Sequence, residues 1–307
     1  MMKNKIVIVG SSNTDMVVRV DHFPQPGETL IGDNFMTAQG GKGANQAVAV
    51  ARLGGDATFV CCLGDDAFGN QSLELLKKEG MDTRHVRLIP GAASGVALIP
   101  VDKKGENTII VASGANAMLS ADDIKAAEDD IRAAGILLMQ LETPIPALTC
   151  AAKMAREAGA TVVLNPAPFP KEPLPAELLE NVDIIIPNET EAAYMTGEQI
   201  TDEASALSVI RKIQAKGIKT VIVTVGKLGA YTLDEDNNLM LVPAFPVKAV
   251  DTVAAGDTFC GALCVALAKG YSLTEAIKVG NKAASIAVTR VGAQPSVPTA
   301  EEVFGSM

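Results

Sequence analysis

The 307-residue sequence contains no tryptophan and only two histidines, His22 and His85, both in loop-like surroundings. With so few histidines, a Ser-His-Asp or zinc–histidine mechanism is disfavoured. No apolar run reaches the length of about 18 residues that a transmembrane helix needs. The apolar stretch 6–9 is too short for a signal peptide and predicts a first strand, so we expect a cytoplasmic protein with no membrane partner.

Paired cysteines and positive charge are also scarce. The five cysteines are odd in number and form no CxxC pair, which argues against a disulfide framework or a zinc cluster. The 26 Lys and Arg residues against 36 Asp and Glu leave a net charge of −10, which disfavours nucleic acid as a partner. A site for an anionic nucleotide must then supply local positive groups: a lysine, helix N-termini or a metal ion.

Short β-branched runs alternate with helical patterns along the chain. The predicted strands are 6–9, 57–62, 135–140, 161–164, 183–186 and 220–225. The predicted helices are 44–53, 70–79, 122–133, 147–157, 204–216, 256–269 and 273–290. This alternation predicts an α/β fold, with a central, mostly parallel sheet and helices on both of its faces.

Two stretches interrupt that rhythm and are typical of strand pairs joined by turns. They are 15–20 with 28–37, and 95–101 with 107–112. We expect a single domain over 1–307 with a small β-sheet lid drawn from about 15–37 and 95–112. An antiparallel edge on the main sheet is the alternative.

The most informative stretch is Asp251-Thr252-Val253-Ala254-Ala255-Gly256-Asp257, which opens a predicted helix. The first N–H groups of a helix lack internal partners and form an anion site, and Asp257 lies in that first turn. An acid beside an anion site suits phosphoryl transfer, because the N–H groups hold charge while the acid takes a hydroxyl proton. An ordinary helix start, with an acid at the positive end of the dipole, is the alternative.

Two polar segments near the N-terminus suit ligand binding. Gly40-Gly41-Lys42-Gly43-Ala44-Asn45 lets a ligand approach the backbone and adds donors, although a glycine-rich turn is the alternative. It is not a P-loop, because Met36 and Gly43 stand where that pattern needs glycine and Ser or Thr. Asn13-Thr14-Asp15 follows the first strand and offers donors and acceptors for hydroxyl groups, with an Asx turn as the alternative.

Two further segments have both a functional and a structural interpretation. Asn188 and Glu191 are three residues apart, so they either hold water around Mg²⁺ or form a capping box. Thr224-Val225-Gly226-Lys227-Leu228-Gly229 either passes under a nucleotide or forms a hairpin turn.

Taken together, these segments resemble the ribokinase (PfkB-type) family of carbohydrate kinases, from Gly10 to Pro298. The family signatures correspond to Gly40-Gly41-Lys42-Gly43-Ala44-Asn45-Gln46-Ala47 and to 251–259. The resemblance implies a ribokinase-like fold and ATP-dependent phosphorylation of D-ribose at its 5-hydroxyl. The alternatives are a kinase for another sugar, such as 2-deoxyribose, or a non-catalytic sugar or nucleotide sensor on the same fold.

The resemblance also implies a role for each candidate residue. Asp257 would accept the hydroxyl proton, and N–H groups of Ala254, Ala255 and Gly256 would hold the moving phosphoryl. The sugar hydroxyls would be bound by Asn13, Asp15, Gly41, Lys42, Gly43, Asn45, Glu142 and Asp257. The nucleotide site would comprise Asn188, Thr224, Val225, Gly226, Lys227, Gly229, Gly256 and Asn281.

The implied cofactors are Mg²⁺, held through water by Glu191, and K⁺ as a monovalent activator. The K⁺ would be bound by the Asp251 carboxylate, the carbonyls of Val253, Ala287, Arg290 and Gly292, and the Ser296 hydroxyl. The alternative is that Asp251 only caps the following helix. D-ribose and ATP are the implied substrates, and the lid is expected to pair two subunits into a homodimer.

Overall fold

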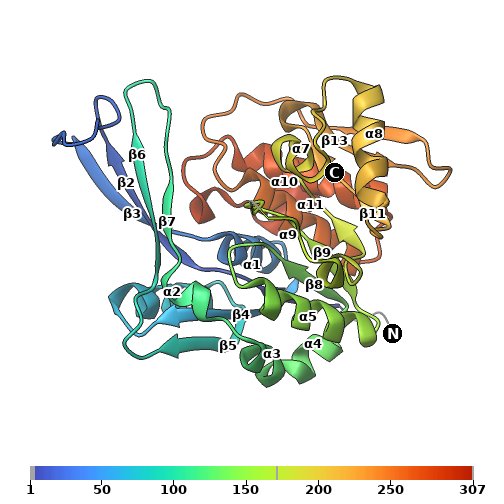
Figure 1. The fold of residues 1–307 in the computed structure, drawn as a ribbon, viewed down its shortest axis with the longest axis horizontal. Helices are drawn as coiled ribbons and strands as arrows, with labels where there is room; N and C mark the ends of the chain where they lie inside the picture. The colour runs from blue at the N-terminus through green and yellow to red at the C-terminus, as the bar shows by residue number, and fades with distance from the viewer. Residues whose placement is uncertain (1–3, 171, 306–307) are drawn as a thin grey trace.

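The structure is a computed structural model that describes residues 4–170 and 172–305. Its centre is a seven-stranded sheet in the order β11-β10-β9-β8-β1-β4-β5, and every adjacent pair is parallel (Figure 1). The strands are β1 (Lys5–Val9), β4 (Asp56–Gly64), β5 (Asp82–Ile89), β8 (Ile136–Met139), β9 (Thr161–Leu164), β10 (Ile184–Ile185) and β11 (Thr220–Val221). The predicted α/β class is confirmed. The sequence does not predict β5, because charged residues interrupt its apolar run.

The alternation of side chains along the strands builds two cores, one on each face of the sheet. Val7 and Val9 of β1 belong to one core, and Ile6 and Ile8 belong to the other. The first core is covered by α3 (Ala121–Ala126), α4 (Glu128–Ala133), α5 (Ile145–Glu157), α6 (Ala176–Leu179), α7 (Glu189–Thr196) and α8 (Glu203–Gln214). The second is covered by α1 (Lys42–Arg52), α2 (Ala67–Lys78), α9 (Ala255–Ala268), α10 (Leu273–Ala287) and α11 (Ala300–Phe304). The helix predicted over 122–133 is divided into α3 and α4 at Ala127.

A four-stranded sheet stands away from the body of the molecule, on the left of Figure 1. Its order is β3-β2-β6-β7, with β2 (Asn13–Arg19), β3 (Asn34–Gly40), β6 (Gly95–Val101) and β7 (Ile110–Ala112). The two predicted strand pairs are its antiparallel pairs, and β2 and β6 join them in parallel. It is a sheet of its own, so the alternative of an edge on the main sheet is wrong. Residues 28–33, expected to be strand, lie outside β3.

A third, three-stranded sheet contains β12 (Val223–Thr224), β13 (Gly229–Leu233) and β14 (Leu239–Pro243), all antiparallel. The predicted strand 220–225 therefore serves two sheets, as β11 and β12. Residues 226–228 form a short 3₁₀ turn between β12 and β13, so the 224–229 segment is a hairpin turn. Among the described residues, no helix is long and apolar enough to cross a bilayer.

Candidate active site

The start of α1 packs directly on the backbone that leaves β1. The N–H of Ala44 donates to the Ser11 carbonyl at 2.8 Å, and Gly41 has a left-handed φ of 87°. A Cβ at Gly41 would lie 2.7 Å from the Asn13 nitrogen, and one at Gly43 would lie 2.5 Å from the Ser11 nitrogen. Glycine is therefore required at both positions, and the close approach brings the di-glycine segment against the residues that follow β1.

Glu142, just beyond the end of β8, ties the same two segments together. Its Oε2 accepts hydrogen bonds from the Lys42 N–H at 2.9 Å and from the Ser11 hydroxyl. Among the described residues, no donor reaches its Oε1. Glu142 thus fixes the N-terminus of α1 and keeps one oxygen available for a ligand hydroxyl.

Asp257 lies in the first turn of α9, with its side chain buried. Asn45 Nδ2 donates to its Oδ2 at 2.9 Å, and Gln46 Nε2 donates to its Oδ1 at 3.0 Å. Both donors belong to α1, so one helix orients the acid carried by another. Each carboxylate oxygen keeps a lone pair for a further donor.

The backbone before Asp257 presents unpaired donors. Ala254, the N-cap of α9, is left-handed with φ 58°, an uncommon conformation for a residue with a Cβ, and no side chain caps the helix. The Ala255 N–H donates to the Thr252 carbonyl at 3.3 Å. In the described part of the chain, the N–H groups of Ala254, Gly256 and Asp257 have no acceptor. Such donors at a helix N-terminus form an anion site.

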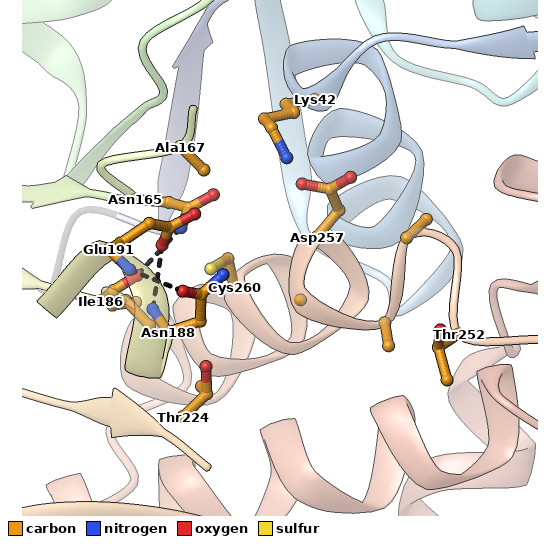
Figure 2. Close-up of a pocket in the computed structure, with 13 residues that line it drawn as sticks. Lys42, Asn165, Ala167, Ile186, Asn188, Glu191, Thr224, Thr252, Asp257 and Cys260 are labelled. Carbon is orange, nitrogen blue, oxygen red and sulfur yellow. Dashed lines mark hydrogen bonds between the residues drawn. The ribbon is translucent and has the colours of Figure 1, made fainter. Parts of the chain in front are cut away.

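A cavity of about 190 Å³ opens in front of these groups. Figure 2 shows the Lys42 ammonium directed toward the Asp257 carboxylate on one side, and Asn188, Glu191 and Thr224 on the other. Its lining also includes Asn165, Ala167, Ile186, Thr252, Ala254, Ala255, Gly256 and Cys260. The cavity therefore joins the predicted base and anion site to part of the predicted nucleotide site.

Charges of both signs, buried at Glu191 and half-buried at Lys42 and Asp15, lie in or near this cavity. Burial opposes the charged form of Lys42, but Asp257 and two further carboxylates outweigh burial and raise its pKa. Burial raises the pKa of Asp15 to about 7, with added repulsion from Glu142 and Asp257. Burial also raises the pKa of Glu191, against hydrogen bonding from the Asn188 backbone. A positively charged ligand or metal ion beside these acids would relieve their repulsion.

Asn13 and Asp15 lie on the same face of β2. Asn116 Nδ2 donates to Asn13 Oδ1 at 2.7 Å, so the Asn13 amide turns its N–H₂ group away from Asn116. The Asp15 carboxylate lies against Gly40, where a Cβ would approach it to 2.2 Å. Asn13 and Glu142 also line a second cavity, of about 350 Å³, at the foot of the four-stranded sheet.

Some of the candidate nucleotide residues line the cavity, and others lie at the neighbouring three-stranded sheet. Asn188 and Glu191 form a capping box at the start of α7, with N–H to oxygen distances of 2.9 and 2.8 Å, yet both also line the cavity. Thr224 pairs with Asn188 and lines it too. The Asn281 side chain instead donates to the Val242 and Pro243 carbonyls at 2.9 and 3.1 Å. It holds the end of β14, where Pro243 pairs with Gly229, the last residue of the turn that also contains Val225, Gly226 and Lys227.

The candidate cation residues lie in the loop before α9 and in the segment from the end of α10 to Ser296, and Asp251 joins the two. Its Oδ1 accepts from the Val253 N–H at 3.0 Å, and its Oδ2 accepts from the Gly292 N–H at 2.9 Å. Because Ala254 is the N-cap of α9, the alternative in which Asp251 caps that helix is wrong. The Ser296 hydroxyl donates to the Ala293 carbonyl at 2.7 Å. The Ala287 carbonyl accepts from the Arg290 N–H at 3.0 Å.

The model of the pfkB family of carbohydrate kinases matches residues 3–300. The chain belongs to this family. A ribokinase of Haemophilus influenzae is 44% identical over 303 residues, which cover 99% of this chain and 98% of that protein. A deoxyribokinase of Salmonella typhimurium is 35% identical over 297 residues, with 97% and 96% covered. The solved structure of Arabidopsis thaliana ribokinase complexed with ribose and ATP has a TM-score of 0.91 and 34% identity, covering 99% and 98%.

Several polar residues of this carbohydrate kinase site receive no role from the sequence. Gln46 directly follows Asn45 in the di-glycine segment, and Asn165 directly follows β9 and lines the cavity. Asn116 and Ser11 act through the side chains that they contact. For Ser11 and Asn165 the available signal was a polar residue just after a predicted strand, but only the tertiary structure shows which groups the four residues meet.

Proposed function

We propose that this chain transfers the γ-phosphoryl group of ATP to the 5-hydroxyl of D-ribose. The observation that carries the proposal is the Asp257 carboxylate, buried and held by two amide donors, beside the unpaired N–H groups that open α9. The similar ribokinases, and the relative whose structure contains ribose and ATP, support this choice of substrates.

In this proposal the chain positions the reactants and supplies charge. Asp257 orients the primary hydroxyl and accepts its proton as the oxygen attacks phosphorus. The N–H groups of Ala254, Gly256 and Asp257 hold the oxygens of the phosphoryl group as it moves. The Lys42 ammonium offsets negative charge on the same side of the cavity.

The sugar would lie between α1 and the foot of the four-stranded sheet. Glu142 offers its free Oε1, Asn13 offers N–H donors, and Asp15 offers a carboxylate. Asn45 and the backbone at Gly41, Lys42 and Gly43 complete the set on the side of Asp257. Closure of the four-stranded sheet over the sugar would exclude water from the reaction.

The nucleotide would lie along Asn188, Thr224, the 225–229 turn and the β14 end held by Asn281. The buried Glu191 carboxylate at the cavity wall fits a hydrated Mg²⁺, since burial makes its charge costly without a cation. When bound, Mg²⁺ would neutralise the phosphate oxygens of ATP. Glu191 would then accept a hydrogen bond from a water molecule bound to the ion, while its Oε2 still accepts the hydrogen bond from the Asn188 N–H.

We also propose a K⁺ site at the two loops joined by Asp251. The oxygens of Asp251, Val253, Ala287, Arg290, Gly292 and Ser296 would supply the ligands. The bond from Gly292 to Asp251 supports the proposal, because it brings both loops together beside the anion site. Ordering of these loops would aim the N–H groups that follow Val253.

We further propose a homodimer formed through the four-stranded sheet β3-β2-β6-β7, called the lid sheet below. Strand register places Phe35, Leu98 and Ile110 on the sheet face opposite to that of Asp15. They are 65%, 45% and 63% exposed, and apolar side chains of that exposure suit an interface. The cytoplasm is the proposed compartment, because ATP is the co-substrate and all five cysteines are free thiols.

A kinase for 2-deoxyribose is the second candidate, since deoxyribokinases are among the relatives. The oriented Asn13 amide favours ribose, because it presents N–H donors to the sugar pocket and would be left unpaired opposite a missing hydroxyl. A coupled assay of ADP formation with ribose, 2-deoxyribose, hexoses and nucleosides tests the proposal. We expect the highest kcat/KM for ribose; a preference for any other sugar, or no turnover, contradicts it.

A further inference from the structure

Two fully buried glutamines form a hydrogen-bond chain that ends on Asp257. Gln140 Nε2 donates to Gln46 Oε1 at 2.6 Å, and Gln46 Nε2 donates to Asp257 Oδ1 at 3.0 Å. The same Gln46 Nε2 donates to Asn165 Oδ1 at 3.1 Å. Both glutamine side chains are 0% exposed, so no bulk water competes for these contacts.

The chain can run in only one direction. A carboxylate accepts hydrogen bonds and donates none, so Gln46 must turn its amide N–H₂ toward Asp257. Its carbonyl then points at Gln140, which must donate in turn. Rotation of the Gln46 amide by half a turn would set a carbonyl oxygen against Asp257 Oδ1 and Asn165 Oδ1.

Gln140 occupies its site despite an unfavourable contact. Among the described residues, its Oε1 is buried with no hydrogen-bond donor. That oxygen lies against Gly10, where a Cβ would approach it to 2.1 Å. A buried acceptor without a donor destabilises a fold, and an apolar side chain of equal length would avoid the loss. For the stability of the fold alone, an apolar residue at position 140 would be better than glutamine. The contact with Gln46, however, requires the hydrogen-bond donor that Gln140 Nε2 supplies.

We propose that Gln140 is a positioning residue for phosphoryl transfer, which acts through Gln46 on the orientation of the Asp257 carboxylate. Asn45 holds the other oxygen of that carboxylate at 2.9 Å, so the two bonds together fix its plane. This inference rests on the proposed role of Asp257 as the base. Gln140 itself lies outside both cavities and contacts no substrate.

Loss of the Gln140 donor leaves the Gln46 carbonyl buried and unpaired. The Gln46 side chain is then held only through its Nε2, by Asp257 and Asn165, so it can shift toward another donor and holds the Asp257 carboxylate less firmly. Fewer bound complexes reach the reactive geometry, so kcat falls. Sugar affinity changes little, because Asn13 and Glu142 are held by other partners.

The test compares three variants with the wild-type enzyme. Gln140→Met keeps the length of the side chain and removes its donor; we expect kcat to fall about tenfold, with KM for ribose and for ATP within about twofold. Gln46→Met should lower kcat at least as far. The double variant should be no slower than Gln46→Met alone, because Gln140 acts only through Gln46. Gln214→Met is the control, since that amide donates to the Lys219 carbonyl at an exposed position on α8.

Thermal unfolding establishes that each variant is folded at the assay temperature. If Gln140→Met is unfolded at that temperature, Gln140→Leu takes its place in the comparison. A folded Gln140 variant with wild-type kcat overturns the inference. The inference is also overturned if the fold-losses of kcat in the two single variants multiply in the double variant, because Gln140 and Gln46 would then act independently. Activity retained in Asp257→Asn would instead refute the proposed base, whatever the glutamine variants do.

Discussion

At the scale of single residues, directional hydrogen bonds between buried polar groups organise the site. Asp257 receives one amide donor on each oxygen, and Asn13 is turned by Asn116. Each contact fixes which atom a side chain presents to the cavity. A change that keeps the size of such a side chain but alters its donors should therefore affect the reaction more than the fold.

Asp257→Asn should abolish turnover and leave ribose binding nearly intact. The substitution keeps the volume of the side chain and removes the group that takes the proton, so we expect kcat to fall by more than about a hundredfold. Steady-state assays and calorimetric titration with ribose measure the two quantities. Retention of more than about a tenth of wild-type kcat, a barrier change below about 1.4 kcal/mol, would contradict the assignment.

Asp15 should make sugar use depend on pH near neutrality. Burial raises its pKa to about 7, so the carboxylate that accepts sugar hydroxyls forms only as the pH rises through that value. We expect kcat/KM for ribose to increase about tenfold between pH 6 and pH 8, with KM for ATP nearly constant. Asp15→Asn, assayed alongside, should be much less active and lack this rise; a flat wild-type profile would contradict the prediction.

The same group links stability to pH. The folded protein holds the Asp15 proton up to about pH 7, whereas the unfolded chain releases it near 3.8. Between these values the folded state binds more protons, so this group lowers the free energy of unfolding as pH rises. Asp15→Asn removes the penalty, and its melting temperature relative to wild type should increase from pH 5 to pH 8. A constant difference would show that Asp15 does not titrate in this range.

Asn13→Met should weaken ribose use more than 2-deoxyribose use. The Asn13 amide is buried and presents N–H donors, and methionine replaces those donors with a longer apolar side chain. The ratio of kcat/KM for the two sugars measures the effect, with Asn70→Met at an exposed position of α2 as the control. Equal losses for both sugars would show that Asn13 does not read the 2-hydroxyl.

At the scale of elements, backbone geometry at helix starts builds the anion site. Glycines let α1 approach the chain that leaves β1, and left-handed Ala254 opens α9 without a side-chain cap. The loop before α9 is also held by the segment that follows α10, through the hydrogen bond from the Gly292 N–H to Asp251 Oδ2. A change in that loop therefore reaches the anion site without contact with a substrate.

K⁺ should activate the enzyme through these loops. The proposed ligands are neutral carbonyls, one hydroxyl and one carboxylate, and two of them, Asp251 and Val253, lie just before the N–H groups of the anion site. Activity with Mg·ATP and ribose should be higher in K⁺ than in Na⁺ or tetramethylammonium at equal ionic strength. Identical rates in the three salts would contradict the cation site.

At the scale of the whole molecule, the lid sheet turns one face toward the proposed sugar pocket and exposes apolar side chains on the other. Ala38, Asp15, Ala97 and Val111 form a row across it on the sugar side, and Val111 lines the cavity at its foot. The opposite face carries Phe35, Leu98 and Ile110. In the proposed function, strand alternation would let one sheet serve both substrate closure and subunit contact.

The protein should sediment as a dimer at micromolar concentration. Leu98→Lys places a charge in the exposed apolar row and should shift the protein toward the monomer, whereas Val247→Lys, at a similarly exposed position outside the lid, should not. Sedimentation velocity with and without ribose measures both. A wild-type monomer under both conditions would contradict the proposed interface.

The sequence by itself determined the fold class, most strands and helices, and the two segments that carry the site. Periodicity is local, so it predicts elements such as β1 and α9, and small residues before Asp257 predict an open helix start. It missed β5, whose charged residues break the apolar run, and it joined α3 to α4. Only the tertiary structure showed that Asp251 bonds to Gly292, that Asn281 holds the end of β14, and that Gln140 reaches Asp257 through Gln46. These contacts join residues far apart in the chain, and their partners depend on how the strand ends meet in space.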